Sequence, residues 1–341
     1  MAGSFVALKP GLKAILRALA IAAKRERKTF HSIATNNFFV ASALLMQEAG
    51  VFVYLVGALV VLFPMSADPL RKVPAERLAL WPLGKADLRT LRLLSPWINP
   101  LTWVLAVLAG WSVKHTESLG VLAVAVGLFA VGFFVPSVSG EPGFLRWIPA
   151  ARGVMGQLVR KNLREILLTL DFYMALLMSV SGLVYRLLIP TLPTEALIVL
   201  TLLVVLALSS YAQCLFGLES SSGLTRYQLM PVAGWRILAA KDIAFLIVTA
   251  VLTLPLAPVA GLTGALTVLA IGHAPSVEER REQTRWRFSS GASFGNGVLQ
   301  TIALAGACMT AWRISAWILV PCAVACAGSA WWYGTAWQRQ R

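Results

Sequence analysis

Charged residues are scarce in this chain. Only 13% of its 341 residues are Asp, Glu, Lys or Arg, whereas 58% are apolar and the mean hydropathy is +0.73. A soluble globular domain carries about 25% charged residues, so this composition excludes that class and leaves no soluble domain of useful size. The sequence therefore predicts an all-α, polytopic integral membrane protein.

Cysteine and histidine are also few. The four cysteines lie in or beside apolar runs, without CxxC or metal-ligand spacing: Cys214, Cys308, Cys322 and Cys326. This favours buried structural thiols. The three histidines, His31, His115 and His273, are scattered, and neither an HExxH motif nor paired acids for magnesium–phosphate chemistry occur. A membrane enzyme with an acidic or histidine cluster at one face is therefore disfavoured, and no metal site is predicted.

A phosphate-binding loop is missing as well. Such a loop needs GxxxxGK[ST], whose glycines let backbone N–H groups wrap the phosphates and whose hydroxyl binds magnesium. Here Gly84 and Lys85 are followed by Ala86, and Ala79 stands where the first glycine belongs. The chain is therefore expected to bind no nucleotide or other cofactor of its own.

Positive charge is abundant but confined to loops. The net charge is +15, and the basic residues concentrate in five segments and at the C-terminus: 9–28, 71–92, 146–164, 226–241, 280–287 and 339–341. The positive-inside rule places all of these in the cytoplasm, together with the N-terminus. The charge is thus explained by membrane topology, and no nucleic-acid partner is predicted.

Apolar runs pair into hairpins between these basic segments. The expected runs are 38–63, 98–112 with 119–138, 167–189 with 196–214, 243–254 with 259–272, and 298–312 with 316–332. The first run is interrupted by Gln47, Glu48 and Gly50, so it forms either one long tilted helix or two short helices. Basic flanks on both sides favour two, and the chain is predicted to have nine or ten spans.

The order of segments predicts two related halves. Residues 1–30 form a basic amphipathic helix with Leu12, Ile15 and Leu19 on one face, which suits the plane of the lipid headgroups; an ordinary basic flank beside the first span is the alternative. The further segments are a first membrane half at 31–139 with a loop at 65–97, a second surface helix at 140–166, and a second half at 167–338 with loops at 215–241 and 273–296.

A short motif repeats at equivalent places in the two halves. The order Arg-x-x-Leu-x-Pro occurs at Arg77, Leu80 and Pro82, and again at Arg226, Leu229 and Pro231. Membrane transporters are often built from internal repeats. We therefore expect an internal duplication with one cytoplasmic contact loop in each half.

The second contact loop has the residues that a docking surface needs. Pro231 fixes the backbone angle at the start of a short helix. Val232, Trp235 and Ile237 offer apolar surface, and Arg226 and Arg236 suit acidic groups on a partner. Alternatively, the arginines anchor lipid phosphates and Pro231 only ends a helix.

Three ionisable residues fall inside apolar runs, where charge is costly and usually faces protein or water. Asp171 and Arg186 lie near the ends of their runs, within reach of the interface. Glu48 is either in the middle of a helix or at a hairpin turn. A proton- or sodium-coupled carrier would use such an acid at mid-membrane, and Glu48 is the clear candidate.

Together these motifs resemble the permease subunits of ABC-2 type exporters. The resemblance rests on Phe216-Gly217-x-Glu219, the following Arg226-x-x-Leu-x-Pro231, a short amphipathic piece ending at Lys241, and a polar segment at 275–291. It implies a bacterial inner-membrane permease that works with a separate nucleotide-binding ATPase, which holds the ATP and magnesium. The other partners it implies are a second permease copy or paralogue and membrane lipids.

Two functions from different classes stay open after this comparison. An ATP-driven export permease is favoured by the contact loops, and an ATP-independent secondary transporter or membrane-embedded assembly factor is the alternative. Apolar walls suit lipids, hydrophobic peptides and many drugs equally, so the sequence singles out no substrate.

Overall fold

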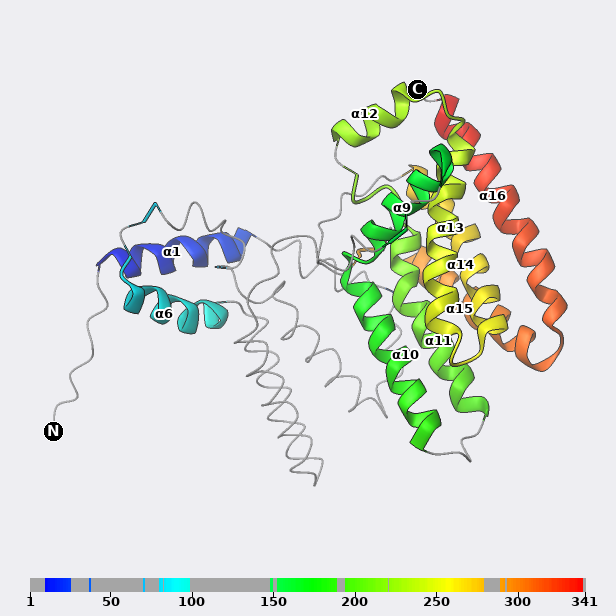
Figure 1. The fold of residues 1–341 in the computed structure, drawn as a ribbon, viewed down its shortest axis with the longest axis horizontal. Coiled ribbons are helices and arrows are strands. Elements are labelled where there is room, and N and C mark those ends of the chain that lie inside the picture. The colour runs from blue at the N-terminus through cyan, green and yellow to red at the C-terminus, as the bar shows by residue number, and fades with distance from the viewer. Residues whose placement is uncertain are drawn as a thin grey trace. The chain divides into compact units, whose positions relative to one another are not determined.

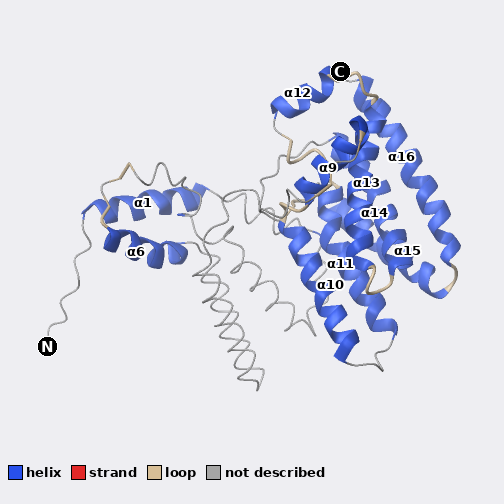
Figure 2. Ribbon diagram, in the orientation of Figure 1, coloured by secondary structure: helices blue, strands red, loops and turns tan. Residues whose placement is uncertain are grey.

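The computed structural model describes residues 10–25, 37, 70, 80–81, 83–98, 148–149, 152–188, 194–219, 221–278, 289–291 and 293–339. The chain divides into two units, one formed by Met1–Phe30 with Gln47–Gly140 and the other by His31–Met46 with Glu141–Arg341 (Figure 1). Every regular element within the described ranges is a helix (Figure 2). The all-α prediction is therefore confirmed for this part of the chain.

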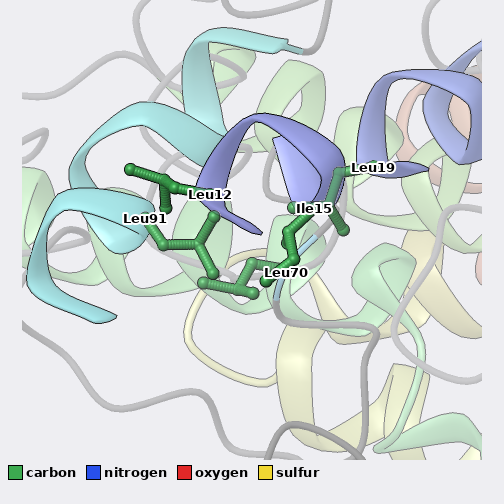
Figure 3. Packing of buried hydrophobic residues seen from close by; sticks show 5 residues of the cluster. All are labelled: Leu12, Ile15, Leu19, Leu70 and Leu91. Atoms are coloured by element: carbon green, nitrogen blue, oxygen red, sulfur yellow. The ribbon is translucent and has the colours of Figure 1, made fainter. Parts of the chain in front are cut away.

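The first unit contains a small core around two helices, α1 (Pro10–Arg25) and α6 (Lys85–Leu94), followed by the 3₁₀ helix η3 (Ser95–Ile98). Figure 3 shows the buried core residues, which are Leu12, Ile15, Leu19, Leu70 and Leu91. The predicted apolar face of α1 thus exists. It packs on Leu70 and Leu91 of the same unit, and a position in the headgroup plane stays a prediction.

The second unit is a helical bundle with two accessory helices. Its elements are α9 (Gly153–Ile166), α10 (Leu170–Leu188), α11 (Thr194–Ala212), α12 (Ser221–Leu229), α13 (Gly234–Thr253), α14 (Pro258–Glu278), α15 (Phe294–Arg313), η5 (Ala316–Ile318) and α16 (Leu319–Arg339). Helix α14 packs against α11, α13, α15 and α16, so it lies at the centre, and α9 packs against α13.

The last three predicted hairpins correspond to the pairs α10/α11, α13/α14 and α15/α16. Helix α13 nevertheless begins at Gly234, nine residues before the predicted start of its apolar run at Ile243. Helix α14 likewise continues to Glu278 through Pro275. The amphipathic piece expected to end at Lys241 is therefore the first part of a longer helix. Charged residues stay inside α13 because their partners lie within the protein, as described below.

Fewer described helices than predicted meet the requirements of a membrane span. Three are long and apolar enough: Thr194–Ala212, Pro258–Glu278 and Ala316–Arg339. Helices α13 and α15, which were predicted spans, are not among them, and within α10 the described apolar stretch is Leu170–Val180. The described part thus shows an all-helical fold with three candidate spans, and nine or ten spans remain a prediction.

The bundle has two distinct ends. One end, which we call the α12 end, carries α12, the start of α13 and the C-terminus of α16 (Figure 1). The opposite end carries the connections between the helices of each hairpin. Ten lysines and arginines of this unit are described, and only two of them, Arg186 and Arg313, lie at the opposite end. The predicted segregation of positive charge therefore holds within the bundle.

Several predictions fall outside the described residues. These are Glu48, Arg77 and Pro82, the apolar runs expected at 38–63 and 119–138, and the run expected at 98–112 beyond Ile98. Leu80 is described and exposed. The duplication of the two halves stays a prediction.

Candidate functional site

The predicted contact residues of the second loop gather where α12 meets α13. We call Arg226, Leu229, Pro231, Trp235 and Arg236 the α12–α13 surface. All five are exposed, and the Leu229 side chain is the most open of the apolar ones at 79%. Val232 is half-buried. Ile237 is fully buried, so its predicted place on the apolar contact surface is wrong. Pro231 lies in the turn between the helices, three residues before α13 begins.

The turn is held by short backbone hydrogen bonds. The Met230 N–H donates to the Arg226 carbonyl at 3.0 Å, and the Val232 N–H donates to the Met230 carbonyl at 2.8 Å. The Arg236 guanidinium lies over the Trp235 ring at 5.3 Å, a cation–π distance. The surface therefore combines a shaped backbone with exposed apolar and cationic groups.

A charge cluster, buried except for Lys161, whose side chain is 43% exposed, lies directly behind this surface. We define it as Lys161 and Glu165 of α9, Glu219 before α12, and Lys241 of α13. Lys161 Nζ lies 2.5 Å from Glu219 Oε2 and 3.3 Å from Glu165 Oε1. Lys241 Nζ lies 3.1 Å from Glu219 Oε1 and 3.8 Å from Glu165 Oε2. Two lysines and two glutamates thus balance one another across three segments.

Neutral side chains complete the cluster. The Tyr227 hydroxyl of α12 donates to Glu219 Oε1 at 2.8 Å and accepts from Lys161 at the same distance. Lys241 donates to Asn162 Oδ1 at 3.2 Å and lies over the Phe216 ring at 4.9 Å. Because Tyr227 belongs to α12 itself, the cluster ties that exposed helix to α9 and α13.

Burial makes the two charged groups with the least exposure costly to leave without a partner. The side chains of Lys241 and Glu219 are only 1% and 3% exposed. Burial alone would raise the pKa of Glu219, but Lys241, Lys161 and the Tyr227 hydrogen bond outweigh it and hold that pKa below the ordinary value. Burial, and then the neighbouring Glu219 charge, raise the pKa of Tyr227. Glu219 is therefore ionised at neutral pH and Tyr227 is neutral.

A second polar cluster lies on the other side of α13. Asp242 of α13, His273 of α14 and Cys326 of α16 are all buried, and their ligand-type atoms lie within 4.8 Å of one another. His273 Nε2 is 2.9 Å from Asp242 Oδ1, and His273 Nδ1 is 3.0 Å from Ser329 Oγ. Ser329 in turn donates to the Ala270 carbonyl at 2.8 Å. We call Asp242, His273 and Cys326 the Asp-His-Cys cluster.

Close helix crossings set these three residues at one level. At the α12 end, a Cβ on Gly334 of α16 would clash with the Trp235 backbone of α13, so only glycine fits the crossing. The two helices run antiparallel from this crossing. Asp242 lies eight residues after Gly234, and Cys326 lies eight residues before Gly334. Both are therefore about 12 Å along their helices from the crossing.

The contact between α13 and α14 likewise places Asp242 and His273 at the same level along their helices. A Cβ on Gly261 would lie 2.5 Å from the Thr253 hydroxyl, which marks the close approach near the opposite end. Asp242 is eleven residues before Thr253, and His273 is twelve residues after Gly261. The α13–α16 contact and the α13–α14 contact thus each help to bring the three side chains together.

The predicted intramembrane residues have different surroundings. Asp171, at the start of α10, is buried and accepts a hydrogen bond from the Ser289 backbone N–H at 2.8 Å. Arg186, near the end of α10, is exposed and donates to the Pro255 carbonyl at 2.8 Å. Asp171 therefore holds the segment that precedes α15, and Arg186 bridges two hairpins.

Sequence reasoning missed both clusters. It treated Lys241 as the end of a loop and His273 as an isolated residue. The signal available was an adjacent Lys241–Asp242 pair directly before an apolar run. Comparison with known proteins found no matching family model, no matching curated protein and no matching solved structure.

Proposed function

We propose that this chain is the permease subunit of an ATP-driven exporter of the ABC-2 type, and that a separate nucleotide-binding ATPase binds the α12–α13 surface. The observation that carries the proposal is the buried charge cluster behind that surface. A loop that receives force from a partner must be rigidly attached to the helices that move. Tyr227 and Glu219 provide that attachment to α9 and α13.

The energetics of the cluster favour motion as a unit. Separating a buried ion pair leaves uncompensated charge in a low-dielectric region, at a cost of about 3–5 kcal/mol. A push on α12 would therefore displace α9 and α13 with it before the ion pairs part. Helix α14, packed against α13, would receive the displacement next.

The charge distribution supports a cytoplasmic position for the α12 end. Eight of the ten described basic residues of the bundle lie there, and cytoplasmic flanks of membrane helices carry the excess of Lys and Arg. An ATPase is confined to that side. With the motif resemblance, this supports a place in the bacterial inner membrane.

The outer helix supports contact with lipid or a second permease copy. The apolar window of α16 is only 11% buried within the chain. Its exposed side chains include Val324, Trp331 and Trp332, and Trp317 of the preceding η5 is exposed too. In the proposed transporter this face meets membrane lipids or the second subunit that completes the path.

The proposal is tested by co-purification with the ATPase encoded beside this gene. Arg226→Ala combined with Pro231→Gly removes one charge and the stiffness of the turn, and should reduce recovery of the ATPase by at least about tenfold, as for a hot-spot loss of 2 kcal/mol. Arg313→Ala removes an exposed arginine at the opposite end and should leave recovery unchanged. Equal recovery of the ATPase with wild type, the double variant and Arg313→Ala would contradict the proposed binding surface.

A second candidate function is favoured by one observation. The Asp242–His273 pair is an ionisable pair buried among helices of the bundle, and such pairs in membrane proteins often form proton relays. A proton-coupled secondary transporter is therefore the alternative. It differs from the permease in requiring no ATPase.

A further inference from the structure

The protons around His273 can be assigned from its neighbours. Ser329 has a single hydroxyl hydrogen, and it points to the Ala270 carbonyl, which can only accept. At 3.0 Å from His273 Nδ1, the Ser329 oxygen must therefore accept, so Nδ1 carries a hydrogen. In neutral imidazole this leaves Nε2 with a lone pair.

That lone pair faces another acceptor. Nε2 lies 2.9 Å from Asp242 Oδ1, a distance at which two acceptors repel unless a positive charge lies between them. The charge is either a proton, held on the imidazole or on the carboxylate, or a metal cation. Both atoms are buried, so solvent does not relieve the repulsion.

Cys326 distinguishes these two solutions. Its sulfur lies within 4.8 Å of one ligand-type atom of His273 and one of Asp242, and no hydrogen bond holds the sulfur among the described residues. The sulfur of the neighbouring Cys322, by contrast, lies 3.5 Å from the Thr267 hydroxyl oxygen, within hydrogen-bond distance. A proton between His273 and Asp242 does not require a nearby thiol, whereas a transition metal binds thiolate strongly.

We propose that Asp242, His273 and Cys326 form a binding site for a divalent transition-metal cation, with Zn²⁺ the ion that best matches their donor set. Nitrogen, sulfur and oxygen donors from three helices suit a tetrahedral ion with one open position. Ser329 and the Ala270 carbonyl act as the outer hydrogen bonds that keep the imidazole in the coordinating tautomer. The site is independent of the proposed transport role.

The charge balance of the site is favourable. On binding, the Cys326 thiol loses its proton to solvent and its sulfur forms a bond to the metal. The cation then faces one carboxylate, one thiolate and a neutral imidazole, so the buried assembly carries no net charge. Tetrahedral ligands are about 3.3–3.7 Å apart, so the widest separation closes by about 1 Å, a side-chain adjustment.

The test uses Co²⁺ as a spectroscopic substitute for Zn²⁺ in the purified full-length protein, stripped of metal by a chelator. Wild type should show a thiolate-to-cobalt charge-transfer band that Zn²⁺ abolishes. Cys326→Ser should remove the band, whereas Cys322→Ser, one turn earlier on the same helix, should keep it. Ser329→Ala should weaken binding by about 10- to 100-fold, the usual effect of losing an outer partner.

A second measurement does not depend on any variant folding. X-ray absorption at the zinc edge of the wild-type protein should show about one sulfur at roughly 2.3 Å with nitrogen and oxygen neighbours. A shell of oxygen alone would overturn the proposal. So would the absence of a cobalt–thiolate band in wild type, or a band that survives Cys326→Ser.

Discussion

Glu219→Gln is expected to lower the free energy of unfolding by about 3–5 kcal/mol, the usual effect of breaking a buried ion pair. The substitution keeps the size of the side chain and removes its charge. Lys241, which is 1% exposed, then retains only the more distant Glu165 as a charged partner at 3.8 Å. The measurement is a denaturant titration in mixed micelles.

A double variant separates charge from packing. Lys241→Met with Glu219→Gln removes both charges and leaves Lys161 paired with Glu165. Because neutral replacement of a whole buried pair is often tolerated, the double variant should be more stable than Glu219→Gln alone. Additive losses from the two substitutions would show that the charges do not interact.

The effect of Glu219 should also depend on pH. Its pKa is lower in the folded protein than the ordinary 4.5, so the folded state binds this proton more weakly than the unfolded state. The stabilisation is then complete above pH 4.5 and is lost as the pH falls through the folded-state pKa. The stability difference between wild type and Glu219→Gln should therefore narrow in acid.

The second large effect is expected at the crossing of α13 and α16. Gly334→Val places a Cβ against the Trp235 backbone, including its nitrogen at 2.7 Å. Side-chain rotation cannot relieve a clash with backbone, so the helices must move apart, at a cost of about 1–3 kcal/mol or more. Thermal unfolding in detergent should show the loss.

Gly328→Val is the matched control for this variant. Gly328 is on the same helix, and a Cβ there meets nothing within 4 Å. The two valines have the same helix propensity, so the comparison isolates the crossing. Moving α16 should also separate Cys326 from Asp242 and weaken the cobalt–thiolate band. Equal stability of the two variants would show that the glycine contact does not set the helix register.

The sequence predicted the last three helical hairpins well because their signal is local. Apolar runs broken by Pro255 and Pro258, or by the stretch before Thr194, place the helix ends within a few residues. The start of α13 was wrong for a physical reason. Lys241 and Asp242 look like the end of a loop on hydropathy alone, but each has a partner on another helix and both lie inside the helix.

The two clusters could not be predicted because their residues are far apart in the chain. Asp242, His273 and Cys326 come together only through the registers of three helices, which glycine contacts determine. Neither periodicity nor motif spacing carries that information. The exposure of Leu229 and Trp235, by contrast, agreed with the expected contact loop, because a short motif around a turn is again a local signal.

The central claim is that the α12–α13 surface binds a separate ATPase. Photo-crosslinking in native membranes tests it most directly, with a photoreactive residue at Leu229 and, as control, at Leu254 at the other end of α13; these side chains are 79% and 69% exposed. We expect a crosslink from position 229, and none from position 254, to a protein with a phosphate-binding loop. A crosslink from position 229 to lipid alone would contradict it.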